Sequence, residues 1–363
     1  MAIRRSKVPP LPVLQVLERF RNALTAVHRR SVPPPVALLE IVQGAFLSQA
    51  LYATAELGVA DALAAGPLRL DELAARVGAR PDALRRLLRP LVSEGIFACR
   101  GETYRLTRLG QPLRSDAPVS VRGGLRFFGD ARHLGLWGLL PSTVRTGEVA
   151  TNQLYGMPFF DYIQKDREFG ELFDSAMTGI SEMTLEPTLA AYDFSAFGTI
   201  VDIAGGRGRL LTEILTRTPR ARGVLFDLPE VVAPVPQRLA ELGLADRCTV
   251  VSGSFFGEVP KGGDAYILKH IIHDWPDEQA ARILANARAA MTDSARLLLI
   301  ELVLPSGNRR TFGNLLDLEM MVSAGGRERT EQEYRDFLAA NGFELLRRIP
   351  TASMDTILEA RPV

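Results

Sequence analysis

The stretch Thr199-Ile-Val-Asp-Ile-Ala-Gly-Gly-Arg-Gly-Arg-Leu-Leu-Thr-Glu-Ile-Leu215 decides the fold of this 363-residue chain. It opens with a short β-branched run, Ile200 to Ile203, which is typical of a buried parallel strand. Three glycines follow, and apolar residues then recur at helical spacing. Strand, glycine turn and helix predict the start of an open α/β sheet, whose ligands bind at the carboxyl ends of the strands. Glycine suits the turn, because a Cβ atom would obstruct a ligand that approaches the backbone closely.

The glycine pattern does not match the dinucleotide motif G-x-G-x-x-G. In the two possible registers the third glycine would fall on Arg209 or Leu211. The pattern acidic-x-small-x-Gly-x-Gly fits instead, with Asp202, Ala204, Gly206 and Gly208. This pattern resembles the first motif of S-adenosylmethionine-dependent methyltransferases, in which the loop wraps an amino acid rather than a pyrophosphate.

Composition and length place limits on the function. A chain of 363 residues predicts two domains, and 47% hydrophobic with 23% charged residues is typical of a soluble globular protein. A formal net charge of +1 gives no overall attraction to nucleic acid or to acidic membranes. The two cysteines, Cys99 and Cys248, make no disulfide framework and lack the neighbours of a zinc site, so we expect no metal.

The N-terminus carries basic residues, but prolines at positions 9, 10 and 12 stand where a signal peptide needs an apolar core. We also expect that no apolar run approaches the about 18 residues of a membrane span. The sequence therefore predicts a cytoplasmic protein without a membrane partner.

The first third of the chain is rich in apolar helix surface. Residues 1–12 are expected to be a loose tail, and Val13 to His28 should form an amphipathic helix. After Pro33-Pro34-Pro35, a second segment from Val36 to Leu57 is apolar enough to be buried on more than one side. A small domain cannot easily cover this surface, so we expect a partner subunit to do so.

A helix–turn–helix with a hairpin is predicted between Leu70 and Thr107. One helix ends at Gly78, a second begins at Pro81, and Phe97 to Thr107 alternates around a turn. This is the pattern of a winged helix, which admits two interpretations. It is either a DNA-binding module or a structural module with a solvated basic face, and the neutral overall charge favours the second. The contacts of the first would be Arg80, Arg85, Arg86 and Arg89.

From Pro118 to Tyr192 the sequence stays helical and becomes rich in aromatic residues and methionine. Such a stripe at helical spacing is more often core than a ligand cage. Its position between the two predicted domains favours the wall of a substrate pocket.

The last third alternates strands and helices, which predicts a doubly wound sheet. The strand Arg222 to Asp227 ends in a carboxylate about 20 residues after the glycines, where an acid accepts hydrogen bonds from ribose hydroxyls. Further strands are expected at residues 248–251, 265–268, 296–303, 343–347 and 356–359.

At the fourth strand of this sheet the sequence reads Tyr266-Ile-Leu-Lys-His-Ile-Ile-His-Asp-Trp-Pro-Asp-Glu278. This is similar to the signature of plant-type small-molecule O-methyltransferases, including bacterial tailoring enzymes of the polyketide, phenazine and mitomycin type. The resemblance runs from about residue 40 to the end, through Ser48-Gln-Ala-Leu-Tyr-Ala-Thr-Ala-Glu-Leu-Gly58, Tyr155-Gly-Met-Pro-Phe-Phe160, Asp227-Leu-Pro229 and Gly325-Gly-Arg-Glu-Arg-Thr330.

The resemblance implies a fold and a domain division. Residues 193–363 would be a Rossmann-like class I methyltransferase domain with a doubly wound seven-stranded sheet that binds S-adenosylmethionine. Residues 13–115 would be a helical, winged-helix dimerisation domain rather than a DNA reader. Residues 116–192 would be connecting helices that line the substrate pocket. A homodimer through the N-terminal helices follows from the same resemblance.

The resemblance also implies the cofactor contacts, which are Ala204, Gly206, Asp227, Ser254, Phe255 and Lys269. Asp227 would hold the ribose, Phe255 would pack against adenine, and Lys269 would contact the cofactor near its adenosyl part or backbone. Two positions depart from the family pattern. Glycine is usual at Ala204, and aspartate is usual at Ser254, where a neutral acceptor for the adenine amino group is weaker than a charged one.

Methyl transfer needs an acceptor oxygen aligned with the sulfonium methyl group and a base that removes the acceptor's proton. By resemblance that base is His273, which lies just past the carboxyl end of a strand and is followed by Asp274. Glu301 and Glu328 would orient the imidazole and stabilise its cation. The remaining histidines, His28, His133 and His270, are interpreted as structural or solvated.

The sequence thus predicts a homodimeric O-methyltransferase that acts on a hydroxyl of an aromatic small molecule. The expected substrate pocket comprises Phe160, Phe173, Met177, Met320 and Met321. Two alternatives remain: a winged-helix transcriptional regulator that senses a small ligand, and a relative with the methyltransferase fold that no longer transfers methyl. Retention of His273 with both glutamates argues against the second alternative.

Overall fold

The computed structural model describes residues 8–363, and its contacts divide the chain into two compact units. We call Thr184–Val363, together with the residues up to Val16, the sheet unit, and Leu17–Met183 the helical unit. The first seven residues of the predicted tail lie outside the described residues, and helix α1 begins at Leu11, inside the range expected to be loose.

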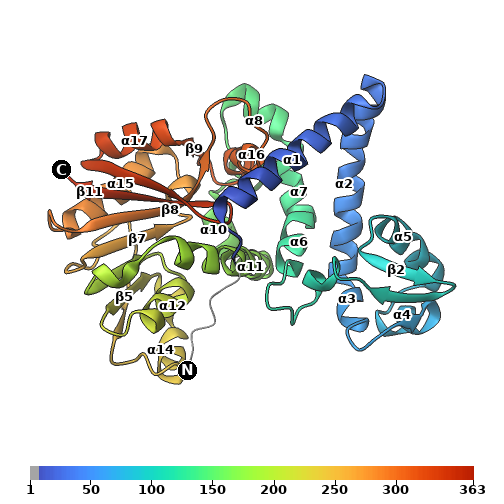
Figure 1. Ribbon diagram of the computed structural model, residues 1–363, viewed down its shortest axis with the longest axis horizontal. Helices are drawn as coiled ribbons and strands as arrows, with labels where there is room; N and C mark the ends of the chain where they lie inside the picture. Colours follow the sequence, from blue (N-terminus) through green and yellow to red (C-terminus); the bar gives the residue numbers. More distant parts are fainter. Residues whose placement is uncertain (1–7) are drawn as a thin grey trace. The chain divides into compact units, whose positions relative to one another are not determined.

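The sheet unit contains the predicted doubly wound sheet (Figure 1). Its strand order is β10-β11-β8-β7-β4-β5-β6, and β11 is antiparallel to both of its neighbours. A short strand, β9 (Arg329–Thr330), pairs with β8 and was not predicted. The strands of the main path are β4 (Thr199–Ile203), β5 (Arg222–Asp227), β6 (Cys248–Ser252), β7 (Ala265–Lys269), β8 (Arg296–Leu304), β10 (Phe343–Pro350) and β11 (Asp355–Pro362).

Helices cover both faces of this sheet. One buried cluster joins the sheet to α15 (Asp277–Ala290) and α17 (Glu331–Ala340). The other joins it to α12 (Arg209–Arg217), α14 (Val235–Glu241) and the end of α11 (Arg167–Ala191). Alternate strand residues enter the two clusters, as in the pair Ile200 and Val201, because successive side chains of a strand point to opposite faces. The predicted fold class is confirmed. The remaining elements here are η2 (Phe194–Ala196), α13 (Pro229–Val232), η3 (Ile272–Asp274) and α16 (Gly313–Ser323).

The register at the carboxyl ends of β7 and β8 positions the candidate site. Lys269 pairs with Ile300, and the next residue of β8, Glu301, lies opposite Thr356 of β11. The end of the parallel pair β7–β8 and the start of antiparallel β11 therefore meet at one edge. This is the edge at which ligands bind in open α/β sheets.

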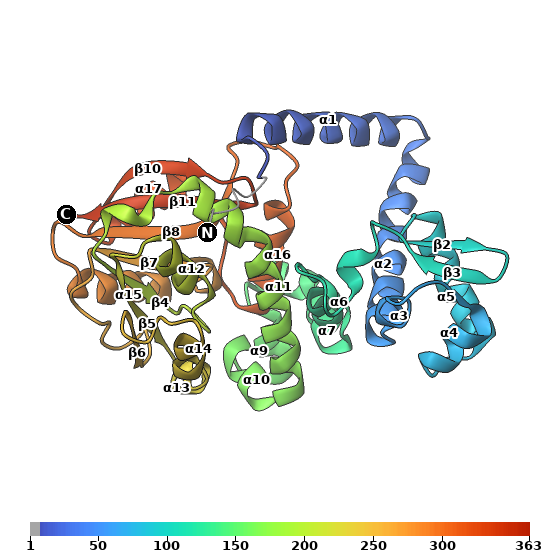
Figure 2. The ribbon, with the colours of Figure 1, turned by 60° about the horizontal axis from the view of Figure 1, so that its bottom comes forward.

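In the helical unit, two helices pack on a small sheet with strand order β1-β3-β2 (Figure 2). The predicted helix–turn–helix consists of α4 (Leu70–Arg76) and α5 (Pro81–Ser93), and the hairpin consists of β2 (Phe97–Arg100) and β3 (Thr103–Leu106). Strand β1 (Leu68–Arg69) is too short to carry a periodic signal. The core contains the fully buried Leu73, Leu84, Leu88, Leu91 and Phe97.

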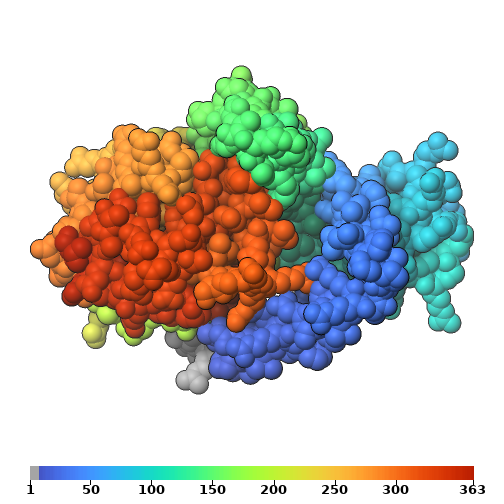
Figure 3. Space-filling model, turned by 90° about the horizontal axis from the view of Figure 1, so that it is seen from above, coloured from blue at the N-terminus to red at the C-terminus, as the bar shows by residue number. Residues whose placement is uncertain are grey.

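Helices α1 (Leu11–Arg30) and α2 (Pro34–Glu56) carry long apolar side chains that are exposed over much of their length. Figure 3 shows the surface of this part of the chain in blue. The expectation that no apolar run approaches a membrane span is wrong for α2. By length and composition alone this helix is long and apolar enough to cross a membrane: an 18-residue stretch of it has a mean hydropathy of 1.4, and none of that stretch is buried. Gln43 and Gln49 interrupt the run, but only two residues of α2 are charged, Glu40 and Glu56, and so the average stays high. The exposed residues of α2 include Val36, Leu38, Leu39, Ile41, Val42 and Phe46.

The aromatic segment of the helical unit is partly core. Phe127 stacks on Phe169 with ring centroids 5.1 Å apart, and Phe159 meets Phe127 edge to face. All three rings are buried. The segment is built from α6 (Arg122–Gly129), α7 (Ala131–Gly138), α8 (Leu140–Thr146), α9 (Ala150–Tyr155), α10 (Phe159–Lys165) and the first part of α11; α3 (Val59–Ala62) and η1 (Gln111–Leu113) complete the unit.

Candidate active site

The glycine turn after β4 has a left-handed backbone, which glycine accepts easily and residues with a Cβ atom adopt rarely. Ala204, Gly206 and Gly208 all have positive φ, at 55°, 59° and 72°. A Cβ atom on Gly205 would lie 2.5 Å from Oδ2 of Asp202. At Gly206 an added Cβ would meet nothing within 4 Å, so the turn leaves open space beside its backbone. That space is where a ligand would approach the N–H groups of the loop.

Asp227, at the end of β5, closes the turn from the neighbouring strand. Its Oδ2 accepts the Gly206 N–H at 2.7 Å, and its Oδ1 accepts the Leu228 N–H at 2.7 Å. Carboxylate oxygens can each accept more than one hydrogen bond, which is the chemistry that ribose hydroxyls require. The turn and this carboxylate therefore fit the ribose of the expected cofactor.

A buried acid lies behind the same turn. Asp202 is almost fully buried, and its Oδ2 has no hydrogen-bond partner. Burial raises the pKa of Asp202 to about 7, the Asp227 charge adds to the rise, and Lys269 opposes it. An orphaned buried oxygen at a ligand-facing loop is expected where a bound group or water completes the hydrogen bonding.

The residues predicted to hold adenine follow β6. Phe255 is half-buried, with its ring edge to face with Phe256 at 4.8 Å and with Trp275 at 5.8 Å between centroids. Its carbonyl accepts the Asn286 Nδ2–H at 2.8 Å, which fixes the loop on α15. Ser254 is exposed, and its Oγ accepts the Phe256 N–H at 3.2 Å. The Ser254 hydroxyl proton is thus free to donate, whereas one of its two lone pairs is already used.

The predicted base, His273, lies in η3 with its side chain surrounded by carboxylates. Its Nδ1 is 2.7 Å from Oε1 of Glu328 and 3.8 Å from Oε2 of Glu301. Its Nε2 is 3.4 Å from Oδ1 of Asp274. The structure thus brings together all four residues that the sequence marked as catalytic. The imidazole is 9% exposed, and both glutamate side chains are fully buried.

Backbone contacts fix this cluster. The N–H groups of Ile271 and Ile272 donate to Oε1 of Glu301 at 3.2 and 2.9 Å, which turns its other oxygen toward His273. The Arg327 N–H donates to the His273 carbonyl at 2.8 Å. Gly326 lies against the same backbone, where an added Cβ atom would overlap the His273 carbonyl oxygen. No sequence pattern indicates this close approach, because the glycine itself carries no chemistry.

The carboxylates control protonation of the base. Burial lowers the pKa of His273, but the charges of Asp274, Glu301 and Glu328 outweigh it, so the pKa lies well above 6.5. Burial raises the pKa of Asp274 to about 6 and also raises that of Glu301, while the His273 cation opposes both shifts. The carboxylates therefore favour the protonated imidazole, which loses its proton only when the pH rises through this raised pKa.

The other predicted residues fall in both units. Lys269 is half-buried at the end of β7. Met320 is buried and Met321 half-buried on α16 of the sheet unit. Phe160, Phe173 and Met177, which are half-buried, belong to the helical unit.

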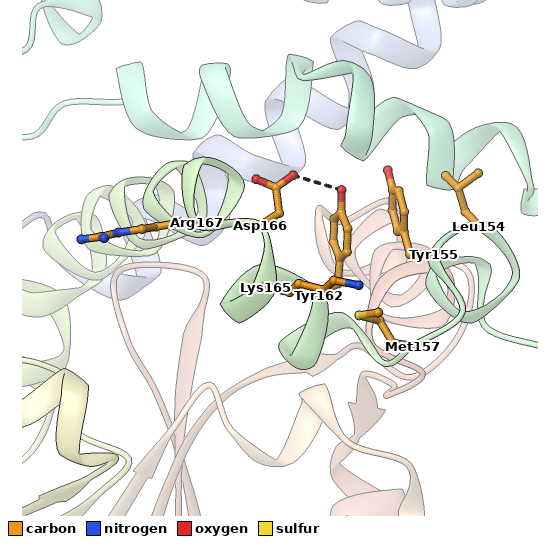
Figure 4. Close-up of a pocket in the computed structure, with 7 residues that line it drawn as sticks. All are labelled: Leu154, Tyr155, Met157, Tyr162, Lys165, Asp166 and Arg167. Atoms are coloured by element: carbon orange, nitrogen blue, oxygen red, sulfur yellow. Dashed lines mark hydrogen bonds between the residues drawn. The ribbon is translucent and has the colours of Figure 1, made fainter.

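A hollow of about 620 Å³ lies over α9 and α10 of the helical unit. Figure 4 shows its two tyrosines side by side; Tyr155 and Tyr162 stack with centroids 3.8 Å apart, and the Tyr162 hydroxyl donates to Asp166 at 3.2 Å. The hollow is lined by Leu154, Tyr155, Met157, Tyr162, Lys165, Asp166 and Arg167. None of the residues predicted for the substrate pocket lines it.

Sequence reasoning missed one residue pair beside the base. His270, interpreted as structural or solvated, has its Nε2 2.8 Å from Oδ1 of the buried Asp355. It also has φ of +54°, and Ala204 is the one other non-glycine residue with positive φ between positions 8 and 363. A separation of 85 residues hides the pair from any local pattern.

Two further findings bear on alternatives. Arg85, a contact of the DNA-binding interpretation, has its Nη2 2.8 Å from Oε1 of Glu102, which also pairs with Arg69. Within residues 8–363, no group of three or more His, Cys, Asp or Glu side chains is arranged to hold a metal ion.

The chain matches two family models. Residues 137–344 match an O-methyltransferase domain, and residues 39–116 match an O-methyltransferase dimerisation domain. The chain is 42% identical to the phenazine O-methyltransferase of Lysobacter antibioticus over 92% of this chain and 98% of that protein. It is 38% identical to the O-demethylpuromycin-O-methyltransferase of Streptomyces alboniger over 94% and 93% of the two chains.

A solved structure with two bound small molecules is also similar. It is an O-methyltransferase from neocarzinostatin biosynthesis in complex with S-adenosylmethionine and 2-hydroxy-5-methyl naphthoic acid. That structure has a TM-score of 0.75 and 33% identity, with 87% of this chain and 96% of that chain covered. A different activity also occurs among relatives, since the aclacinomycin 10-hydroxylase of Streptomyces purpurascens is 36% identical over 82% and 81% of the two chains.

Proposed function

The chain belongs to the S-adenosylmethionine-dependent O-methyltransferase family of bacterial secondary metabolism, and we propose that it methylates a hydroxyl group on an aromatic small molecule with His273 as the general base. The finding that supports this most directly is the contact between Nδ1 of His273 and Oε1 of Glu328 at 2.7 Å. It directs the Nδ1 proton to the carboxylate, so the lone pair of a neutral ring lies on Nε2.

The proposed mechanism needs alignment and one proton transfer. When bound, S-adenosylmethionine supplies an already activated methyl group on its sulfonium. Gly206, Asp227 and Phe255 would hold the nucleoside beside the glycine turn. Nε2 of His273 takes the proton of the acceptor hydroxyl, and Glu328 with Glu301 stabilises the imidazolium that forms.

An aromatic acceptor accords with the chemistry of the side chains predicted for the substrate pocket, which are Phe160, Phe173 and Met177 of the helical unit and Met320 and Met321 of the sheet unit. Aromatic rings and thioethers bind flat apolar molecules through dispersion and edge contacts. The relatives whose names specify a phenazine or a puromycin precursor, and the neighbour with a bound hydroxynaphthoic acid, are consistent with this class of acceptor.

We further propose a homodimer. The dimerisation model covers residues 39–116, and the apolar side chains of α2 that water contacts in one chain would be covered by a second copy rather than by lipid. We assign residues 13–115 to dimerisation, 116–192 to the substrate pocket and 193–363 to the cofactor and catalysis. A cytoplasmic location accords with the biosynthetic role of the similar O-methyltransferase from neocarzinostatin biosynthesis.

The test is an acceptor screen read by mass spectrometry. The purified chain is incubated with S-adenosylmethionine and hydroxylated phenazines, naphthoic acids, quinones and phenolic acids, each paired with its O-methyl ether as a blocked control. We expect the mass of one methyl group to be added to a free-hydroxyl compound and not to its ether.

The negative outcomes separate the alternatives. Binding of S-adenosylhomocysteine without methylation of any acceptor would favour a relative that has lost methyl transfer. Failure to bind S-adenosylhomocysteine, combined with a sequence-selective DNA footprint, would favour the ligand-sensing regulator.

A further inference from the structure

The residue at which β7 leaves the sheet has an unusual backbone. His270 directly follows β7 with φ of +54°, a conformation that residues with a Cβ atom adopt rarely. Its own N–H still donates to the Ile300 carbonyl at 3.0 Å, as the next bond of the sheet. A strained residue of this kind persists only where its surroundings hold it.

The His270 side chain is held by Asp355, an acid at the start of β11. Nε2 of His270 lies 2.8 Å from Oδ1 of Asp355, whose side chain is fully buried. Burial alone would raise the pKa of Asp355, but the His270 charge, its hydrogen bond, Lys269 and a hydrogen bond from Thr184 together lower it. Asp355 is thus an ionised, buried partner rather than a chance surface contact.

Asp355 is itself firmly placed. It begins β11 and pairs with Leu302 in the antiparallel register. Its carbonyl accepts the hydroxyl of Thr351 at 2.7 Å, and its N–H donates to the hydroxyl of Ser353 at 3.2 Å. The anchor for His270 is therefore part of the rigid β10–β11 connection.

The catalytic cluster begins immediately after His270. The next two N–H groups, of Ile271 and Ile272, leave the sheet and donate to Glu301, and the base comes one residue later. The rings of His270 and His273 are 5.6 Å apart. A rotation of the backbone at His270 would therefore move the base and also the two donors that orient Glu301.

We propose that His270, held by Asp355, is a positioning residue that fixes the turn carrying the base His273. The inference rests on the proposed function only for the role of His273 as base. The anchor acts through geometry: it holds a left-handed residue at the end of β7, and so sets where η3 begins. His270 does not contact the reacting atoms in this scheme.

Two substitutions of His270 separate the side-chain bond from the backbone conformation. His270→Gln retains an N–H donor at about the place of Nε2 but accepts positive φ no better than histidine. His270→Gly accepts positive φ freely but loses the bond to Asp355. If the anchor positions the base, His270→Gln keeps kcat within about threefold, while His270→Gly loses about tenfold or more. KM for S-adenosylmethionine and the affinity for S-adenosylhomocysteine stay unchanged in both.

Asp355→Asn and the double variant His270→Gly/Asp355→Asn complete a double-mutant cycle with His270→Gly and the wild type. We expect Asp355→Asn to lower kcat, and the double variant to be no worse than His270→Gly, because the two residues act as one unit. The readout independent of catalysis is ¹⁵N NMR of the histidine rings, assigned with His273→Gln. The His273 ring signals should keep their wild-type titration in His270→Gln and shift in His270→Gly.

Several outcomes would overturn the proposal. His270→Gly with wild-type kcat and unchanged His273 signals would show that the side chain positions nothing. His270→Gly more active than His270→Gln would show that only the backbone conformation matters. Failure of the proposed function looks different: the wild type would methylate no acceptor, or His273→Ala would stay fully active, and the ring signals would still decide whether His270 positions His273.

Discussion

Nδ1 of His273 lies 2.7 Å from Oε1 of Glu328, although the two residues are 55 positions apart, His273 in η3 and Glu328 in the loop before β9. The contact is buried, so water screens it little. It fixes the ring orientation and directs Nε2 away from Glu328, to the side where Oδ1 of Asp274 lies 3.4 Å from it. The same contact makes the ring a stronger base, because the imidazolium is stabilised more than the neutral form.

The first prediction concerns the base itself. His273→Ala should lower turnover by roughly 10²–10⁴, which is the usual contribution of a positioned general base. The loss should be smaller for acceptors with more acidic hydroxyls, which lose their proton without help. Initial rates on a series of phenols of graded acidity measure this.

The control for this variant is cofactor affinity. Calorimetry with S-adenosylhomocysteine should give the wild-type value, since the proposed contacts of the nucleoside are Gly206 and Asp227. Full activity of His273→Ala on a weakly acidic phenol would mean that the enzyme works by alignment alone.

The second prediction is a pH dependence with a defined sign. Neutral His273 is the active form, so kcat should rise with pH through a pKa well above 6.5. Glu328→Gln removes one of the charges that raise this pKa, and the rising limb should therefore move to lower pH while the maximal rate falls. If the rising part of the kcat–pH profile lies at the same pH in Glu328→Gln as in the wild type, His273 is not the titrating group.

The same shift has a consequence for stability. Because the His273 pKa is raised in the folded state, its ionised ring stabilises the fold fully below about pH 6.5 and progressively less as the pH rises through the raised value. The melting temperature, measured at a series of pH values across that range, should depend less on pH in Glu328→Gln than in the wild type.

The third prediction concerns the cofactor. Asp227→Ala should weaken binding of S-adenosylhomocysteine by roughly 1–3 kcal/mol through lost charge-assisted hydrogen bonds. Ser254→Ala is the matched control and should cost less, because Ser254 is exposed and one of its lone pairs is already used by the Phe256 N–H. Calorimetric titration of the two variants checks both. A larger loss in Ser254→Ala would show that the serine is a principal adenine contact.

Much of the sheet and of the base cluster is predictable from sequence, for a physical reason. The glycine turn, the β-branched strands and Asp227 are local signals, and each strand's carboxyl end lies at a known edge of the sheet. His273 and its carboxylates are found through a family signature. The positions of Glu301 and Glu328 relative to the ring are a matter of register and loop packing, which spacing does not contain.

Other features leave no local signal at all. The pair of His270 with Asp355 joins two strand ends 85 residues apart, and the strand β9 is two residues long. The apolar character of α2, by contrast, is a local signal that the sequence does carry, although scattered polar residues obscure how high its average hydropathy is. The hollow over α9 and α10 depends on how two tyrosines stack.

The fourth prediction concerns assembly. The exposed apolar face of α2 should bury an interface upwards of about 2,000 Å² in total between two copies. Phe46→Glu, at a side chain 71% exposed in the single chain, should dissociate the dimer, because an unpaired charge in such an interface is costly. Val144→Glu on α8, 66% exposed and outside the range of the dimerisation model, is the control and should leave the dimer intact. Light scattering at micromolar concentration distinguishes them, and a monomeric wild type would contradict the account of α2.

The last prediction concerns Gly326, which touches no ligand in the proposed mechanism. An added Cβ would overlap the His273 carbonyl oxygen and lie 2.5 Å from the Asp274 carbonyl carbon. Both contacts are with backbone, which cannot move aside as a flexible side chain does, so Gly326→Ala must displace η3 or the loop that carries Glu328. Overpacking of this kind costs roughly 1–3 kcal/mol, and the displacement should lower kcat well beyond the loss of stability. Gly138→Ala is the control, because a Cβ there meets nothing within 4 Å. The measurements are the melting temperature and kcat of both variants. If Gly326→Ala loses stability but keeps wild-type kcat at a temperature where it is folded, the position of the base does not depend on the packing of this loop.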